Sequence, residues 1–106
     1  MDTPIDQSTF VTPKPLPRPS VTIEFCDRCR WLHRASWVQT ELFLTFPPPV
    51  LKSITLVPLK SEETAGRFRV WLHEDSNGET PILLWDRKVE GGFPELKHLV
   101  SPLLQV

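Results

Sequence analysis

Cysteine is scarce in this sequence: the 106 residues include two cysteines, alongside four glycines, one methionine and no tyrosine. Structural zinc sites usually close with four ligands, so two cysteines would need histidines to complete one. With so few thiols, any sulfur chemistry in this protein must come from a single pair, Cys26 and Cys29, which stand two residues apart.

Long apolar runs, strong net charge and a targeting segment are also missing. No apolar run approaches the roughly 20 residues that a membrane helix needs, and a net charge of −1 creates no basic field for nucleic acid or anionic lipid. The first residues carry Asp2 and Asp6 but neither a positive start nor an apolar core, so we expect no secretory signal. These absences predict a cytoplasmic protein without nucleic-acid or membrane partners, in which thiols are held mostly reduced.

The first nineteen residues differ in composition from the remainder. They contain five prolines and few large apolar side chains, so they cannot bury enough surface to offset the entropy of ordering. We therefore expect a flexible, proline-rich leader over residues 1–19. Residues 20–106 are long enough for one small domain with a modest core.

The cysteine pair lies where two different periodicities meet. Over residues 21–25, apolar and polar side chains alternate, which predicts a strand with one buried face. From Arg28 to about Phe46, apolar residues recur every three or four positions, which predicts an amphipathic helix. Cys26 and Cys29 would then lie at a helix N-terminus, where unpaired N–H groups and a partial positive charge favour a thiolate.

The remaining patterns predict three more strands and a final helix. Residues 51–59, 67–74 and 81–85 have strand composition, and Ser76-Asn77-Gly78 supplies turn residues between the last two. Residues 91–95 should open a helix, with Pro94 in its first turn, and the helix should kink or stop near Val100, because Pro102 interrupts it. The resulting order, β-α-β-β-β-α, predicts an α/β (α+β) thioredoxin-like fold with a four-stranded mixed sheet. Whether both helices cover the same face of that sheet stays open.

Two motifs in the chain resemble a known family. Residues 26–35, CDRCRWLHRA, are similar to the CxxC and the following Trp-Leu and Arg-Ala positions of the selenoprotein W-like (SelT/SelW/SelH, or Rdx) family. Residues 85–97, WDRKVEGGFPELK, are similar to the family's signature before its final helix. The resemblance covers roughly residues 20–101.

The resemblance implies a thioredoxin-like redox protein that acts in cell redox homeostasis through its CxxC. Cys26 and Cys29 would be the catalytic residues, with no metal or other cofactor and with glutathione or a protein thiol as partner. Selenoprotein members carry selenocysteine at the position of Cys29, so this chain looks like a selenium-free member. Whether it is an enzyme is left open by the resemblance, although a thiol oxidoreductase is the expectation.

The attacking sulfur is not decided by the sequence. Position on a thioredoxin-like scaffold favours Cys26, expected to be the more exposed, whereas the selenocysteine position of relatives favours Cys29; we favour Cys26.

Thioredoxins also place a cis-proline opposite the CxxC. The corresponding segment here is expected at residues 64–67, which contain no proline, so a narrower thiol reaction is expected than general disulfide reduction.

Other interpretations of these residues exist. The chain could be a non-enzymatic redox-sensing interaction module, or the cysteines could be an inert buried pair. A metal site would need Cys26, Cys29 and His33, with His73 or His98 as the fourth ligand.

Elsewhere, residues 86–88 are expected to form a solvated turn in which Arg87 or Lys88 could meet an acidic thiol. The four tryptophans are expected to pack in or beside the core.

Overall fold

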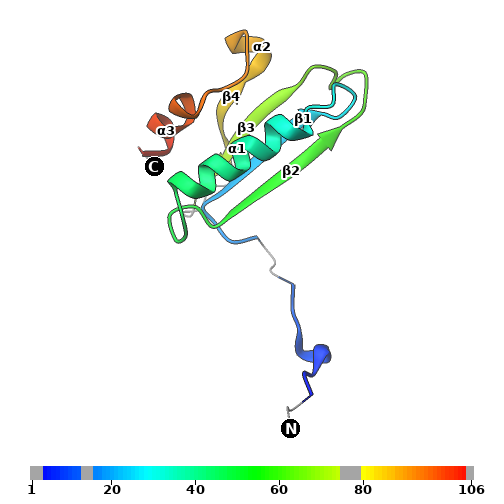
Figure 1. Ribbon diagram of the computed structural model, residues 1–106, viewed down its shortest axis with the longest axis vertical. Coiled ribbons are helices and arrows are strands. Elements are labelled where there is room, and N and C mark those ends of the chain that lie inside the picture. The colour runs from blue at the N-terminus through cyan, green and yellow to red at the C-terminus, as the bar shows by residue number, and fades with distance from the viewer. Residues whose placement is uncertain (1–3, 13–15, 75–79, 105–106) are drawn as a thin grey trace.

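The computed structural model describes residues 4–12, 16–74 and 80–104. The main elements follow the predicted order, with a short helix added after the fourth strand (Figure 1). Their bounds are β1 Ser20–Cys26, α1 Leu32–Thr45, β2 Ser53–Leu59, β3 Phe68–His73, β4 Ile82–Asp86, α2 Arg87–Glu90 and α3 Leu96–Leu104. A single 3-10 turn, η1 Gln7–Thr9, precedes them. The predicted α+β architecture is confirmed.

The four strands form one mixed sheet in the order β2-β1-β3-β4. β1 pairs in parallel with β2 and antiparallel with β3, and β3 pairs antiparallel with β4. At the carboxyl end of β1, Cys26 lies opposite Leu59, and its neighbour Phe25 lies opposite Phe68. The end of β1 is therefore flanked by the end of β2 and the start of β3. The predicted turn at residues 76–78 lies outside the described residues.

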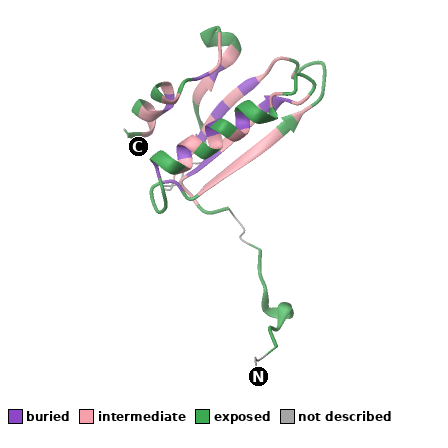
Figure 2. Ribbon diagram, viewed as in Figure 1, coloured by how far each residue is buried: buried purple, intermediate pink, exposed green. Residues whose placement is uncertain are grey.

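Both long helices cover the same face of the sheet. Alternate side chains of β1 and β3 are buried on that face, and they form one cluster with residues of α1 and with Leu99 of α3. Figure 1 shows α1 and α3 on the same side of the strands, and Figure 2 shows the buried positions concentrated beneath α1. Full burial of a large apolar side chain contributes about 1.5–3 kcal/mol, so this single cluster is the main source of stability. The sequence left open whether both helices cover the same face of the sheet, and the structure shows that they do.

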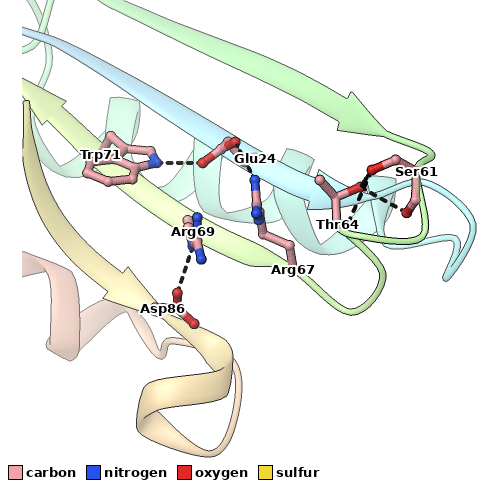
Figure 3. Close-up of polar contacts among 7 residues, drawn as sticks. All are labelled: Glu24, Ser61, Thr64, Arg67, Arg69, Trp71 and Asp86. Carbon is pink, nitrogen blue, oxygen red and sulfur yellow. Dashed lines mark hydrogen bonds and ion pairs between the residues drawn. The ribbon is translucent and has the colours of Figure 1, made fainter.

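The opposite face of the sheet carries paired polar side chains (Figure 3). Trp71 donates its indole N–H to a Glu24 carboxylate oxygen at 2.7 Å, and Arg67 donates to the other oxygen of Glu24 at 3.3 Å. Arg69 donates to Asp86 at 2.7 Å. Because these buried and half-buried polar groups satisfy one another, this face needs no covering helix.

Residues 86–88 are not the solvated turn that the sequence predicts. Asp86 is only 7% exposed and caps α2, accepting hydrogen bonds from the backbone N–H groups of Lys88 and Val89. Burial raises the pKa of Asp86, but the Arg69 hydrogen bond and ion pair and the two N–H donors outweigh it and hold the pKa below its ordinary value. The ion pair with Arg69 on the neighbouring strand accounts for the buried position of Asp86, and no local pattern in the sequence predicts that pair.

The last helix also differs from its prediction. α3 begins at Leu96, so Pro94 lies before the helix and not in its first turn, and the helix continues through Pro102 to Leu104 and does not stop near Val100; the alternative of a kink there stays a prediction. Proline removes one backbone hydrogen bond here. Val100 and Leu103 both pack against the core, and their burial offsets that loss. None of the helices in the described ranges has the length and apolar character to cross a membrane.

The leader is exposed over residues 4–12 but attached just before β1. The Pro17 carbonyl accepts a hydrogen bond from the Ser53 hydroxyl at 2.7 Å, and the Pro19 carbonyl accepts one from the Lys52 N–H at 2.8 Å. The end of the leader is therefore joined to the start of β2. Flexibility of residues 1–19 stays a prediction.

Replacing Asp86 with alanine is expected to destabilise the protein by about 1–3 kcal/mol, because it removes both a helix cap and a buried ion-pair partner. Urea unfolding of both proteins as a function of pH measures the difference. A lowered native pKa stabilises the fold above the unfolded value of about 3.9, and this contribution disappears as pH falls through the native value. The difference in free energy of unfolding between wild type and Asp86→Ala should therefore have its full size at pH 7 and decrease below about pH 4.

Glu95→Ala serves as the matched control, since Glu95 pairs with Lys97 at 3.2 Å but both side chains are exposed. Exposed pairs contribute about 0–1 kcal/mol, so this variant should unfold close to wild type. Equal effects of the two substitutions would contradict the role given to Asp86.

Candidate functional site

The cysteines lie in a turn between β1 and α1. Residues 27–30 form the turn, Trp31 precedes the helix, and α1 begins at Leu32. The Arg30 N–H donates to the Asp27 carbonyl at 2.9 Å, and Arg30 has a positive φ of 60°. The prediction that the helix starts at Arg28 is therefore wrong. Cys29 stands three residues before the helix, so turn amides rather than the helix terminus contact the sulfur atoms.

The two sulfur atoms face each other at 2.6 Å, and both cysteines are free thiols. Cys26 is 1% exposed, whereas Cys29 is exposed. The expectation that Cys26 is the more accessible sulfur is therefore wrong. The reason is tertiary: the Cys26 N–H donates to the Arg67 carbonyl and the Asp27 N–H donates to the Leu59 carbonyl, each at 2.9 Å. The chain around residues 59–67 thus covers Cys26 and leaves Cys29 at the surface.

The two thiols have different acidities. Burial raises the pKa of Cys26, but hydrogen bonds from the Cys29 thiol and from the N–H groups of Gly66, Cys29 and Arg28 bring it below its ordinary value. The pKa of Cys29 is raised, chiefly because its thiol donates a hydrogen bond to Cys26, and burial adds to this; the charge of Arg87 acts in the opposite direction. The pair therefore retains one proton, held on Cys29, when the first thiolate forms on Cys26.

The segment opposite the cysteines is the one the sequence indicates, residues 64–67. The Gly66 N–H hydrogen-bonds to both sulfur atoms, and Gly66 has a φ of +76° that favours glycine. A Cβ at this position would lie 3.4 Å from the Lys88 side chain. No proline occurs in this segment, and the residue that presents its amide to the two sulfur atoms is a glycine.

An aromatic cluster lies beside the turn and holds an arginine. The rings of Trp31 and Phe93 meet edge to face with centroids 4.8 Å apart, and Phe93 meets Phe68 in the same manner at 5.4 Å. The guanidinium of Arg87 lies over Trp31 at 4.8 Å from the ring centroid, and that of Arg34 lies over Phe93 at 4.0 Å. Trp31 thus packs as predicted. Sequence reasoning missed the meeting of Arg87 and Phe93 with Trp31, although both lie in the second motif, residues 85–97.

A groove of about 240 Å³ continues from this cluster along α1. Its lining consists of His33, Arg34, Trp37, Val38, Phe68, Phe93 and Pro94. Trp37 is 49% exposed, so it edges the groove instead of packing in the core. Trp85 does pack as predicted: its indole N–H donates to the Gly92 carbonyl at 3.0 Å, and its ring stacks on His98.

The metal site considered from the sequence does not assemble. His73 contacts Thr22 and lies opposite Ser20, at the other end of β1 from the cysteines. His98 accepts a hydrogen bond from the Glu95 N–H and stacks on Trp85. Across residues 4–12, 16–74 and 80–104, no three side chains of His, Cys, Asp or Glu come together to hold an ion.

Comparison with known proteins agrees with this geometry. The Rdx family model matches residues 20–104. A crystal structure of a protein from Bordetella parapertussis is 38% identical with a TM-score of 0.65, covering 81% of this chain and 94% of that one. The crystal structure of a selenoprotein W-related protein from Vibrio cholerae is 32% identical with the same TM-score, covering 81% and 92%. Among curated proteins there is no significant match. The chain therefore belongs to the Rdx family, whose selenoprotein W-related members share its thioredoxin-like fold.

Proposed function

We propose that this protein is a thiol–disulfide oxidoreductase in which Cys29 exchanges with the partner and Cys26 resolves the mixed disulfide. One observation carries the proposal: two free sulfur atoms face each other at 2.6 Å, one exposed and one buried among N–H donors. Such a pair can close into a disulfide with little movement of the backbone. Acting in the cytoplasm, it would contribute to redox homeostasis.

In the reducing direction, Cys29 first passes its proton to the Cys26 thiolate along the hydrogen bond between the two sulfur atoms, and the Cys29 thiolate then attacks one sulfur of a partner disulfide. The partner's S–S bond breaks, a mixed disulfide forms on Cys29, and the departing partner thiolate takes up a proton. Cys26 then releases its proton, and its thiolate attacks the Cys29 sulfur and expels the second partner thiolate, which is also protonated. The partner gains two electrons and two protons, and Cys26 and Cys29 become a disulfide.

In the oxidising direction, access and acidity favour the same division of roles. A partner thiolate can reach only the exposed sulfur, Cys29, so Cys26 becomes the leaving group. A leaving thiol departs faster when its pKa is low, and the N–H groups of Gly66, Cys29 and Arg28 lower that of Cys26. Buried Cys26 therefore suits the resolving and leaving positions, which reverses the preference drawn from the sequence.

The partner is proposed to be glutathione or a protein thiol. Positive side chains border the exposed sulfur: Arg28 and Arg30 are exposed in the turn, and the Arg87 and Lys88 side chains lie against Gly66. These charges suit a thiol that carries carboxylates, as glutathione does. Oxidised glutathione and the uncharged hydroxyethyl disulfide therefore make a matched pair of probes.

A redox-sensing interaction module is the second candidate function. The observation that favours it is the groove edged by half-exposed Trp37 next to the aromatic cluster, since exposed aromatic side chains are frequent in protein interfaces. Capture of the same partner by wild type and by a Cys26→Ser, Cys29→Ser double variant would favour the module. Capture that requires Cys29 would favour the oxidoreductase.

Cys26→Ser is expected to accumulate a mixed disulfide with either probe, because Cys29 still reacts but nothing resolves the product. Cys29→Ser is expected to form at least tenfold less adduct, since its remaining sulfur is buried. Intact-protein mass spectrometry without reductant measures both. Adduct on Cys29→Ser but not on Cys26→Ser would reverse the assignment, and no adduct on either variant would reject the oxidoreductase.

The reduced pair is expected to titrate in two separated steps, one below and one above the ordinary thiol value, because the thiols share a hydrogen-bonded proton. Absorbance of the thiolate at 240 nm against pH measures the steps. The exchange rate should rise with pH through both steps, because the attacking Cys29 thiolate is a minor form of the singly deprotonated pair and becomes the main form only above the upper step. A single step for both thiols near about 8.5 would contradict the coupling.

A further inference from the structure

Arg87 occupies an unusual position for an arginine. It is the first residue of α2, yet its side chain is half-buried beside the cysteine turn and lies over the ring of Trp31. Its Nε is buried and has no hydrogen-bond partner within the described protein. A buried N–H without a partner costs roughly 1–3 kcal/mol, and stacking on aromatic rings offsets part of that cost. Stability alone therefore gives a weak reason for an arginine at this position.

A single residue links Arg87 to the sulfur atoms. The guanidinium Nη1 donates to the Gly66 carbonyl at 3.3 Å, and the N–H of the same Gly66 hydrogen-bonds to both Cys26 and Cys29. Gly66 lies in a loop, so its amide has no helix or strand of its own to hold it in place. Arg87 thus holds the residue that presents a donor to the thiol pair.

We propose that Arg87 is a positioning residue for this redox pair: it fixes the Gly66 amide against the two sulfur atoms and places a permanent positive charge beside Cys29. The inference rests on the proposed exchange function and adds the group that makes the exposed sulfur reactive. An arginine suits this role because its planar group can stack on Trp31 and donate to Gly66 at once, and because it stays charged at any working pH.

Other charged groups near the turn do not duplicate this arrangement. Asp27 pairs with Lys60 at 3.8 Å at the surface, and Arg67 pairs with Glu24 on the far face of the sheet. Arg28 and Arg30 are exposed, so water screens their charges. Lys88 approaches Gly66 from the same helix, but its side chain is also exposed. The charge of Arg87, in contrast, lowers the pKa of Cys29.

The test uses the full chain with Cys26→Ser as the parent, so that Cys29 is the single thiol. Arg87→Met removes the charge and the hydrogen bond, and Arg87→Lys restores the charge alone. Arg34→Met is the matched control. Like Arg87, Arg34 stacks its guanidinium on a ring of the aromatic cluster, at 4.0 Å from the centroid of Phe93, but it comes from α1. Thermal unfolding of each variant shows whether it is folded at the working temperature.

Arg87→Met is expected to raise the pKa of Cys29, read from thiolate absorbance at 240 nm, and to slow mixed-disulfide formation with hydroxyethyl disulfide at pH 7 by about threefold to tenfold. Arg87→Lys should recover most of the titration shift, and Arg34→Met should titrate like the parent. The uncharged probe reports on the sulfur itself, without any attraction between Arg87 and a carboxylate.

Unchanged titration and rate in folded Arg87→Met would overturn the proposal while leaving the exchange function in place. Equal shifts in Arg34→Met and Arg87→Met would also overturn it, since they would show a general charge or packing effect. If the parent forms no mixed disulfide at all, the exchange function itself fails, and the titration still decides whether Arg87 acts on Cys29.

Discussion

The structure of the site depends on backbone pairing at the carboxyl end of β1. The N–H of Cys26 bonds to Arg67 and that of Asp27 bonds to Leu59, so chain segments from both flanking strands close over the point where β1 ends. This pairing buries one cysteine while the turn carries the next one outward. A strand in the middle of a sheet makes this arrangement available, because both of its neighbours can contribute the cover.

Burial and backbone donors act together on the thiol pair. A buried thiolate is unfavourable in apolar surroundings, yet the amides of Gly66, Cys29 and Arg28 solvate Cys26 as water otherwise would. The result is a buried sulfur whose pKa is lowered, next to an exposed sulfur whose pKa is raised. The proposed exchange through Cys29 and resolution by Cys26 rest on this difference in pKa and access.

Residues of the second motif, 85–97, contribute to the site through contacts with segments that are distant in the sequence. Asp86 caps α2 and pairs with Arg69, which sets the start of the helix, and Arg87 then projects toward Trp31 and Gly66. Phe93, seven residues beyond Asp86, packs edge to face on Trp31 and on Phe68. The two motifs that carry the family resemblance are therefore halves of one site, joined by an aromatic cluster and a guanidinium.

The sequence by itself determined the order of the four strands and the two long helices, the strand that leads into the cysteines and the closeness of the two thiols. Alternation over residues 21–25 and the three-to-four spacing along α1 are local patterns, and a separation of two residues keeps two cysteines close in any turn. Only the tertiary structure decided that Cys26 is covered, that Asp86 is buried and that α3 continues through Pro102. Each of these outcomes depends on groups supplied from distant segments, such as the carbonyl of Arg67, the guanidinium of Arg69 and the apolar core beneath Leu103. Local patterns cannot report such contacts, because the partners come together only when the sheet has formed.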